Sequence, residues 1–235
     1  MSNTGYYIAR GLNEAPARGT GLTVLHADKP YMEEPLTPRY LIRCREYALT
    51  HGVYLIPSRF VLRGFLCLCL LSPKGELIGI QRATHLNLSM TEIRKRTSNI
   101  EVFDTGVGRI FLAVDTDIYH PELLRAAKRM GAQVVVSSQY ISAFEYSSRH
   151  LLRGAYNAAQ SNGLYVINTN GSTCSIAAPR QATPDQSGYL LPPEAAHSAG
   201  AAFDAGLADS FTAFYPAPDF PDFALSGRYF HKLSY

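Results

Sequence analysis

The chain has 235 residues, of which 46% are hydrophobic and 17% are charged, as in an ordinary folded protein with a sizeable core. The net charge is +3 and the 22 basic residues are scattered, so the sequence lacks the basic stripe that indicates a nucleic-acid partner. No low-complexity linker separates candidate cores. We therefore expect a single domain over residues 1–235, with about 200–235 as C-terminal closure and tail.

The apolar segments and the cysteines bear on the cellular compartment of the protein. The longest apolar run, Gly64–Leu71, is far shorter than the roughly 20 residues that span a bilayer, and the N-terminal residues do not resemble a secretory signal. We expect no membrane partner and a cytoplasmic location. Cys44, Cys67, Cys69 and Cys174 lack the paired spacing of zinc ligands, so we expect reduced core residues.

The first half of the chain predicts mostly strands. Thr37-Pro38 can cap and begin a helix that ends near Gly52, and Ser89 with Glu92 forms a candidate capping box for a short helix to about Arg96. Both faces of the apolar segment 59–71 are apolar, which predicts one buried strand. The strands that we expect are 5–10, 21–27, 53–58, 59–71 and 77–83, with a turn at 72–76 between the last two.

The second half predicts strands that alternate with helices. A buried strand, Ile110–Val114, runs into polar residues 115–117, and Pro121 then begins a helix that Gly131 can end. Such a strand, turn and helix start often presents a reactive side chain. We further expect a strand at 132–138, a helix at 141–161 and a strand at 164–168, hence a largely parallel buried sheet. Beyond residue 170 we expect irregular closure.

Several blocks of the chain, in order, resemble the carbon-nitrogen hydrolase (nitrilase/amidase) superfamily from about Leu49 to Pro179. The blocks include a "GVYLIPS" segment, a hairpin with a "P-x-G-E" turn, a strand end similar to "Y-R-K-x-H-L" and a turn similar to "C-Y-D-x-R-F-P-E". In this sequence they lie at 48–58, 71–79, 81–86 and 103–122, and three further blocks lie at 131–136, 162–167 and 175–179.

The resemblance implies an α-β-β-α four-layer sandwich and a Glu-Lys-Cys catalytic triad. In that chemistry a thiolate attacks an amide or nitrile carbon, a carboxylate moves the proton, and an ammonium stabilises the charge that develops. The resemblance also implies a homo-oligomer, such as a homodimer, that pairs through the helices at 121–131 and 141–161. It implies no cofactor.

The positions of the three catalytic residues are altered in this chain. Aligning the turn on Asp117 and Pro121 places Asp115 where the family has cysteine. Aligning the preceding strand end places Ala83 where the family has lysine, and the first carboxylate position falls on Ala27, or on Asp28 if the register shifts by one. We therefore expect the family's thiol chemistry to be absent.

The same alignment indicates which side chains form the pocket. The family carries arginine and phenylalanine where this chain has Tyr119 and His120, so the pocket wall differs too. Asp115 and Asp117, with His120 nearby, could bind a divalent cation, but no third anchored ligand is evident from spacing, so we expect no metal. More simply, Asp117 braces the turn and Asp115 is solvated in a former pocket. The expected pocket residues are Glu92, Thr116, Asp117, Tyr119, His120 and His85.

Three hypotheses about function follow. The first is a pseudoenzyme that has a degenerate site and binds a small amide-like or carboxylate ligand, or a protein partner. The second is a hydrolase for non-peptide carbon-nitrogen bonds with a rearranged site that uses Asp115 and Asp28 or Glu92. The third is an assembly module that acts through its pairing helices.

Overall fold

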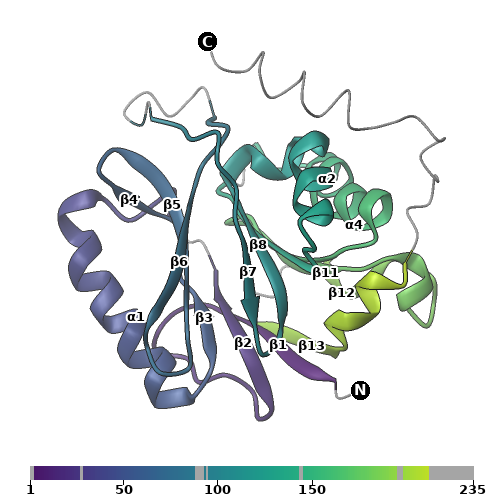
Figure 1. The fold of residues 1–235 in the computed structure, drawn as a ribbon, viewed down its shortest axis with the longest axis horizontal. Coiled ribbons are helices and arrows are strands. Elements are labelled where there is room, and N and C mark those ends of the chain that lie inside the picture. The colour runs from purple at the N-terminus through teal and green to yellow at the C-terminus, as the bar shows by residue number, and fades with distance from the viewer. Residues whose placement is uncertain are drawn as a thin grey trace.

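The computed structural model describes residues 3–26, 29–87, 93, 95–142, 145–194 and 198–211. Two β-sheets face each other in the centre of the molecule, and helices cover their outer faces (Figure 1). The predicted α-β-β-α four-layer sandwich is therefore confirmed.

The first sheet is built mainly from the N-terminal half of the chain. β1 and β2 are parallel, as are β2 and β3, whereas the other pairs are antiparallel. Helix α1 (Thr37–His51) lies outside this sheet and ends at Gly52, which has a φ of 63°. The strand order is β13 (Ala199–Phe203), β1 (Thr4–Ala9), β2 (Thr20–Leu25), β3 (Tyr54–Ile56), β5 (Phe65–Leu71) and β4 (Phe60–Leu62), with β6 (Leu77–Arg82) also paired to β5.

The second sheet follows the predicted alternation of strands and helices. The sheet is mixed and not largely parallel as expected, because β8, β9 and β10 are parallel whereas the three outer pairs are antiparallel. Helices α2 (Pro121–Arg129) and α4 (Asn157–Asn162) cover its outer face (Figure 1). The strand order is β12 (Tyr189–Glu194), β11 (Cys174–Ala177), β10 (Tyr165–Thr169), β9 (Val134–Ser138), β8 (Gly108–Val114) and β7 (Val102–Thr105).

Three apolar cores hold the four layers together. Because side chains alternate along a strand, β5 and β8 each bury residues on both faces. Between the sheets, Leu68 of β5 and Leu112 of β8 belong to one core. On the outer faces, Cys69 packs with α1 in a second core and Phe111 packs with α2 in a third. All four cysteines are buried and free, as predicted.

Two predicted elements differ from the structure in the first half of the chain. The single strand expected at 59–71 is a hairpin of β4 and β5, because Arg63 and Gly64 both have positive φ, 53° and 77°, and form a two-residue turn. Because both strands are apolar, the sequence showed one continuous apolar segment and did not predict the turn. The short helix expected at 89–96 lies largely outside the described residues, as does its capping residue Glu92.

Two further differences concern the second half. The helix expected at 141–161 begins only at Ser148, and it contains α3 (Ser148–Leu151), a π-helical segment (Leu152–Tyr156) and α4. The region beyond residue 170 is not irregular throughout, since β11, β12 and β13 lie there, and β13 pairs with β1. Residues 212–235 of the expected tail lie outside the described residues.

Short 3-10 helices connect several of these elements. They lie at Glu34–Leu36, Asp115–Tyr119, Arg180–Ala182 and Ala205–Asp209. Within the part of the chain that the structure describes, none of the helices has the length and apolar character needed to cross a membrane.

Candidate functional site

The turn after β8 has an uncommon backbone conformation. Asp115 follows the last residue of β8 and has a φ of 55°, a region that residues other than glycine seldom adopt. The 3-10 helix Asp115–Tyr119 then leads to Pro121, where α2 begins as predicted. A strained residue at the end of a buried strand is typical of a position that must aim a side chain in one direction.

Asp115 is held by a partner that the sequence analysis did not identify. Arg59, between β3 and β4, is fully buried and its Nη1 donates a hydrogen bond to Asp115 Oδ1, so the pair joins the two sheets. Asp115 itself is 2% exposed, so the expectation of a solvated carboxylate is wrong. Arg59 Nε and Nη2 have no hydrogen-bond partner among the described residues. The signal in the sequence was a single charged residue before the apolar segment 60–62.

Burial dominates the electrostatics of this pair. Burial raises the pKa of Asp115, the positive charge of Arg59 lowers it, and the charge of Asp117 raises it. Burial likewise lowers the pKa of Arg59, against the attraction of Asp115. The two shifts have the same cause: removal of each charge from water outweighs the attraction between them.

Asp117 braces the turn after β8 through hydrogen bonds to backbone N–H groups. Its carboxylate is fully buried and accepts hydrogen bonds from the backbone N–H of Thr84 at 3.2 Å, of His85 at 2.8 Å and of Val114 at 3.3 Å. It also accepts one from Thr84 Oγ1 at 2.6 Å. These bonds tie the loop after β6 to the end of β8, and they agree with the bracing role inferred from the sequence.

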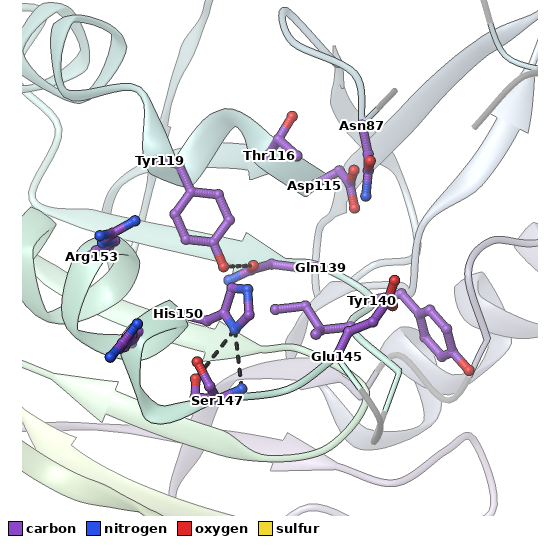
Figure 2. Close-up of a pocket in the computed structure, with 12 residues that line it drawn as sticks. Asn87, Asp115, Thr116, Tyr119, Gln139, Tyr140, Glu145, Ser147, His150 and Arg153 are labelled. Atoms are coloured by element: carbon purple, nitrogen blue, oxygen red, sulfur yellow. Dashed lines mark hydrogen bonds between the residues drawn. The ribbon is translucent and has the colours of Figure 1, made fainter. Parts of the chain in front are cut away.

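A cavity of about 600 Å³ opens beside Asp115 (Figure 2). Tyr119 points into it and donates a hydrogen bond to Gln139 Oε1 at 2.5 Å, and Gln139 Nε2 in turn donates to Asn168 Oδ1 at 2.7 Å. Gly154 lets the helix approach closely, since a Cβ there would lie 2.9 Å from the Tyr119 ring. The lining residues are Asn87, Asp115, Thr116, Tyr119, Gln139, Tyr140, Ile141, Glu145, Ser147, Arg149, His150 and Arg153.

The structure brings only some of the expected site residues together. Among the described residues, Asp115, Thr116 and Tyr119 line the cavity, whereas Asp117 lies beneath the turn. Ala83 is fully buried in the core between the sheets. Ala27, Asp28 and Glu92 lie outside the described residues.

The two histidines of the expected pocket form a separate cluster. In the described part of the chain, the group with metal-ligand spacing consists of His85, His120 and Glu122, and it does not include Asp115 or Asp117. Burial, together with the charge of His85, lowers the pKa of His120. The cavity residues that sequence reasoning missed, such as Gln139 and Arg153, come from segments after β9, and the sequence carried no signal that they face Asp115.

Comparisons with known proteins agree on the family. The profile of the carbon-nitrogen hydrolase family matches residues 40–191, which include all of the blocks identified in the sequence. No curated protein sequence is similar enough to match.

Solved structures share the fold at low sequence identity. Nit3 from Saccharomyces cerevisiae, a member of branch 10 of the nitrilase superfamily, is 15% identical, with a TM-score of 0.70 over 93% of this chain and 96% of that chain. A carbon-nitrogen hydrolase from Helicobacter pylori is 15% identical, with a TM-score of 0.68 over 88% and 92%. An amidase variant from Nesterenkonia is 16% identical, with a TM-score of 0.66 over 90% and 95%. Because the family profile covers more than half of the chain, the chain belongs to the carbon-nitrogen hydrolase family.

Proposed function

We propose that this chain is a carbon-nitrogen hydrolase homologue that does not perform thiol-dependent amide or nitrile hydrolysis and that binds a small carboxylate ligand in the cavity beside Asp115. The observation that carries the proposal is the buried ion pair between Arg59 and Asp115. Asp115 stands at the position where the family resemblance implies a cysteine nucleophile, and its carboxylate is bound to Arg59.

The chain offers no replacement thiolate at this turn. Burial raises the pKa of Cys44 and of Cys67 to about 12 and that of Cys174 to about 11, and it raises the pKa of Cys69 well above its usual value. Thiols in that state are poor nucleophiles. Ala83, at the expected lysine position, has no charge with which to stabilise a tetrahedral intermediate. Losses of coupled catalytic residues reduce turnover by about 10⁴- to 10⁶-fold.

The carboxylate of Asp115 is a weak substitute for the thiolate. An acyl-aspartate formed from an amide would be a mixed anhydride, which needs strong electrostatic help. The nearest guanidinium, Arg59, is already bound to Asp115 on the interior side. These points favour a binding function over a carboxylate-based hydrolase, which the experiment below also tests.

The wall of the cavity supports an anionic ligand. Arg149 and Arg153 line it from the segment around α3, and Gln139 and Asn87 add amide groups that can hydrogen-bond a carboxylate (Figure 2). A related amidase variant has been solved in complex with butyramide. Butyrate and butyramide are therefore a matched pair of probes, of similar size and different charge.

The first test is a panel of amides and nitriles, for which we expect no product above the background rate. Turnover that disappears in Asp115→Ala would overturn the proposal and support the carboxylate-based hydrolase.

The second test is calorimetric titration with butyrate and butyramide. We expect the wild type to bind butyrate more tightly than butyramide. Arg153→Glu, which changes an exposed residue of the cavity wall, should weaken the affinity for butyrate about three- to tenfold, in line with the small energies of solvent-exposed charge pairs. Arg125→Glu, on the exposed side of α2, is the matched control and should bind as the wild type does. Equal binding of butyrate by wild type and Arg153→Glu would rule out the proposed ligand class.

A further inference from the structure

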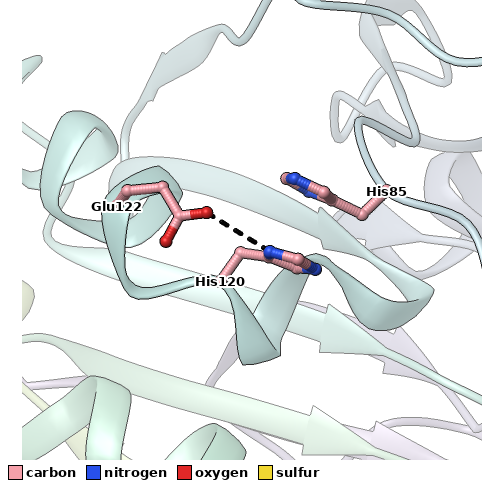
Figure 3. A group of neighbouring side chains, drawn as sticks. All are labelled: His85, His120 and Glu122. Atoms are coloured by element: carbon pink, nitrogen blue, oxygen red, sulfur yellow. Dashed lines mark hydrogen bonds and ion pairs between the residues drawn. The ribbon is translucent and has the colours of Figure 1, made fainter. Parts of the chain in front are cut away.

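We propose that His85, His120 and Glu122 form a binding site for a divalent transition-metal ion such as Zn²⁺, separate from the cavity beside Asp115. One ligand atom from each of the three side chains lies within 4.8 Å of the others. Figure 3 shows the His85 ring over the His120 ring, with the Glu122 carboxylate beside them. Two imidazoles and one carboxylate are a ligand set that zinc and related ions prefer.

The fold brings these residues together from two parts of the chain. His85 lies in the loop after β6 of the first sheet. His120 is the residue before α2, and Glu122 lies in the first turn of that helix, after β8 of the second sheet. An ion bound here would therefore connect the two halves of the sandwich.

The three side chains lie close enough to share an ion once the stack of the two rings opens. The two imidazole rings are parallel within 8°, with centroids 3.3 Å apart, and His120 Nδ1 lies 3.3 Å from Glu122 Oε1. The side chains of His85, His120 and Glu122 are 23%, 34% and 39% exposed, so an ion can reach them from solvent. Because the lone pair of an imidazole nitrogen lies in the plane of its ring, one of the two stacked rings must rotate out of the stack before both histidines can reach the roughly 2.0–2.2 Å that zinc requires.

A buried carboxylate orients one of the proposed ligands. His85 Nδ1 lies 3.2 Å from Asp117 Oδ1 and 2.8 Å from Thr84 Oγ1, and Thr84 Oγ1 itself donates to Asp117. These contacts favour the tautomer with the proton on Nδ1, which leaves the lone pair of Nε2 available. Histidines that bind metals nearly always donate their other N–H to a carboxylate or carbonyl in this way.

The charges around the cluster also suit a cation. Glu122 supplies one negative charge directly, and Asp117 supplies a second through His85. Without an ion, the stacked histidines would cover one face of each imidazole ring for a modest gain, so stacking alone is the competing explanation for the cluster. The family resemblance carries histidine and glutamate at the positions of His85 and Glu122 but phenylalanine at the position of His120, so it is His120 that completes the three-residue set in this chain.

Metal binding at this cluster would also affect the cavity wall. Asn87 lies two residues after His85, and Tyr119 directly precedes His120; both line the cavity. An ion that holds the two histidines together would restrain both wall residues. The proposal does not depend on the ligand of the cavity, and it is tested without one.

The test is a titration of the full, tag-free chain with Zn²⁺ after treatment with a chelator, followed by Co²⁺ to observe the visible absorption of the bound ion. We expect one ion per chain. His120→Phe and Glu122→Gln should each weaken binding at least about tenfold, the lower end of what disturbance of a metal site costs. His51→Ala, which removes an exposed histidine of α1, should bind as the wild type does.

Equal affinity of the wild type and Glu122→Gln, or no ion bound per chain, would overturn the proposal. Circular dichroism of each variant shows whether it is folded. If His120→Phe does not fold, the half-exposed Glu122→Gln decides the outcome. Loss of metal binding with unchanged butyrate binding would leave the proposed function intact, so the two proposals fail separately.

Discussion

Arg59 and Asp115 lie 56 positions apart in the chain and form a buried ion pair that joins the two sheets of the sandwich. A pair of this kind costs free energy to desolvate, and the loss of one partner leaves an uncompensated charge in the interior. The intact pair therefore adds little net stability, whereas removal of one partner should cost much more free energy of folding.

Arg59→Met should destabilise the protein by about 3–5 kcal/mol at neutral pH, because it leaves the Asp115 carboxylate buried without its cation. Loss of the positive charge that lowers the pKa of Asp115 raises that pKa further above its unfolded value. The folded variant then takes up a proton more readily than the unfolded chain, so its stability is greatest at acidic pH and falls as the pH rises through the folded pKa.

Urea denaturation of wild type and Arg59→Met between pH 5 and pH 8 measures this difference. We expect a smaller destabilisation at pH 5 than at pH 8. The control is Arg59→Met combined with Asp115→Asn, since asparagine tolerates the positive φ of residue 115 and removes the buried charge. A double variant as unstable as Arg59→Met at pH 8 would show that lost packing, and not the unpaired charge, causes the defect.

Asp117→Ala should destabilise the protein by about 3 kcal/mol or more, because it leaves the buried backbone N–H groups of Thr84 and Val114 and the partly buried N–H of His85 without acceptors. The midpoint of thermal or urea unfolding reports the change. Asp104→Ala, on the exposed side of β7, is the matched control and should change stability little. Similar stability of the two variants would argue against the bracing role of Asp117.

The four cysteines should not react with a thiol reagent in the folded protein. With a pKa of about 11, Cys174 has a thiolate fraction of about one in a thousand at pH 8, and the other thiols have less. Mass spectrometry after brief alkylation at pH 8 should show an unmodified chain, and the same treatment in urea should label all four cysteines. Rapid labelling of one cysteine in the native protein would reopen the question of thiol chemistry.

A homo-oligomer that pairs through α2 and the α3–α4 segment stays a prediction. Two large apolar side chains are exposed there, Met130 at 50% just after α2 and Leu152 at 54% after α3. Light scattering should show a dimer for wild type and a monomer for Leu152→Glu. Leu49→Glu, on the exposed face of α1, is the control and should remain a dimer. A wild-type monomer at working concentration would rule out this interface.

Local patterns predicted the elements that surround the site. The apolar strand Ile110–Val114, the helix start at Pro121 and the two-faced burial of the segment before Leu71 all follow from short-range periodicity and proline chemistry. The hairpin turn at Arg63 was missed, because an arginine at positive φ gives no signal in the composition. Likewise the π-helical segment has the same apolar spacing as an α-helix over its short length.

The sequence by itself determined the family, the four layers and the presence of a carboxylate at residue 115, because these depend on residue type and spacing along the chain. Only the tertiary structure decided that Asp115 faces Arg59 across the sheets, that Gln139 and Arg153 share its cavity, and that His85 stacks on His120. Each of these contacts joins residues from separate elements. The contacts of Arg59 and His85 depend on how the two sheets pack together, and the cavity depends on how the segments after β8 and β9 lie beside the helical segment of Arg153; no local pattern of side chains specifies either.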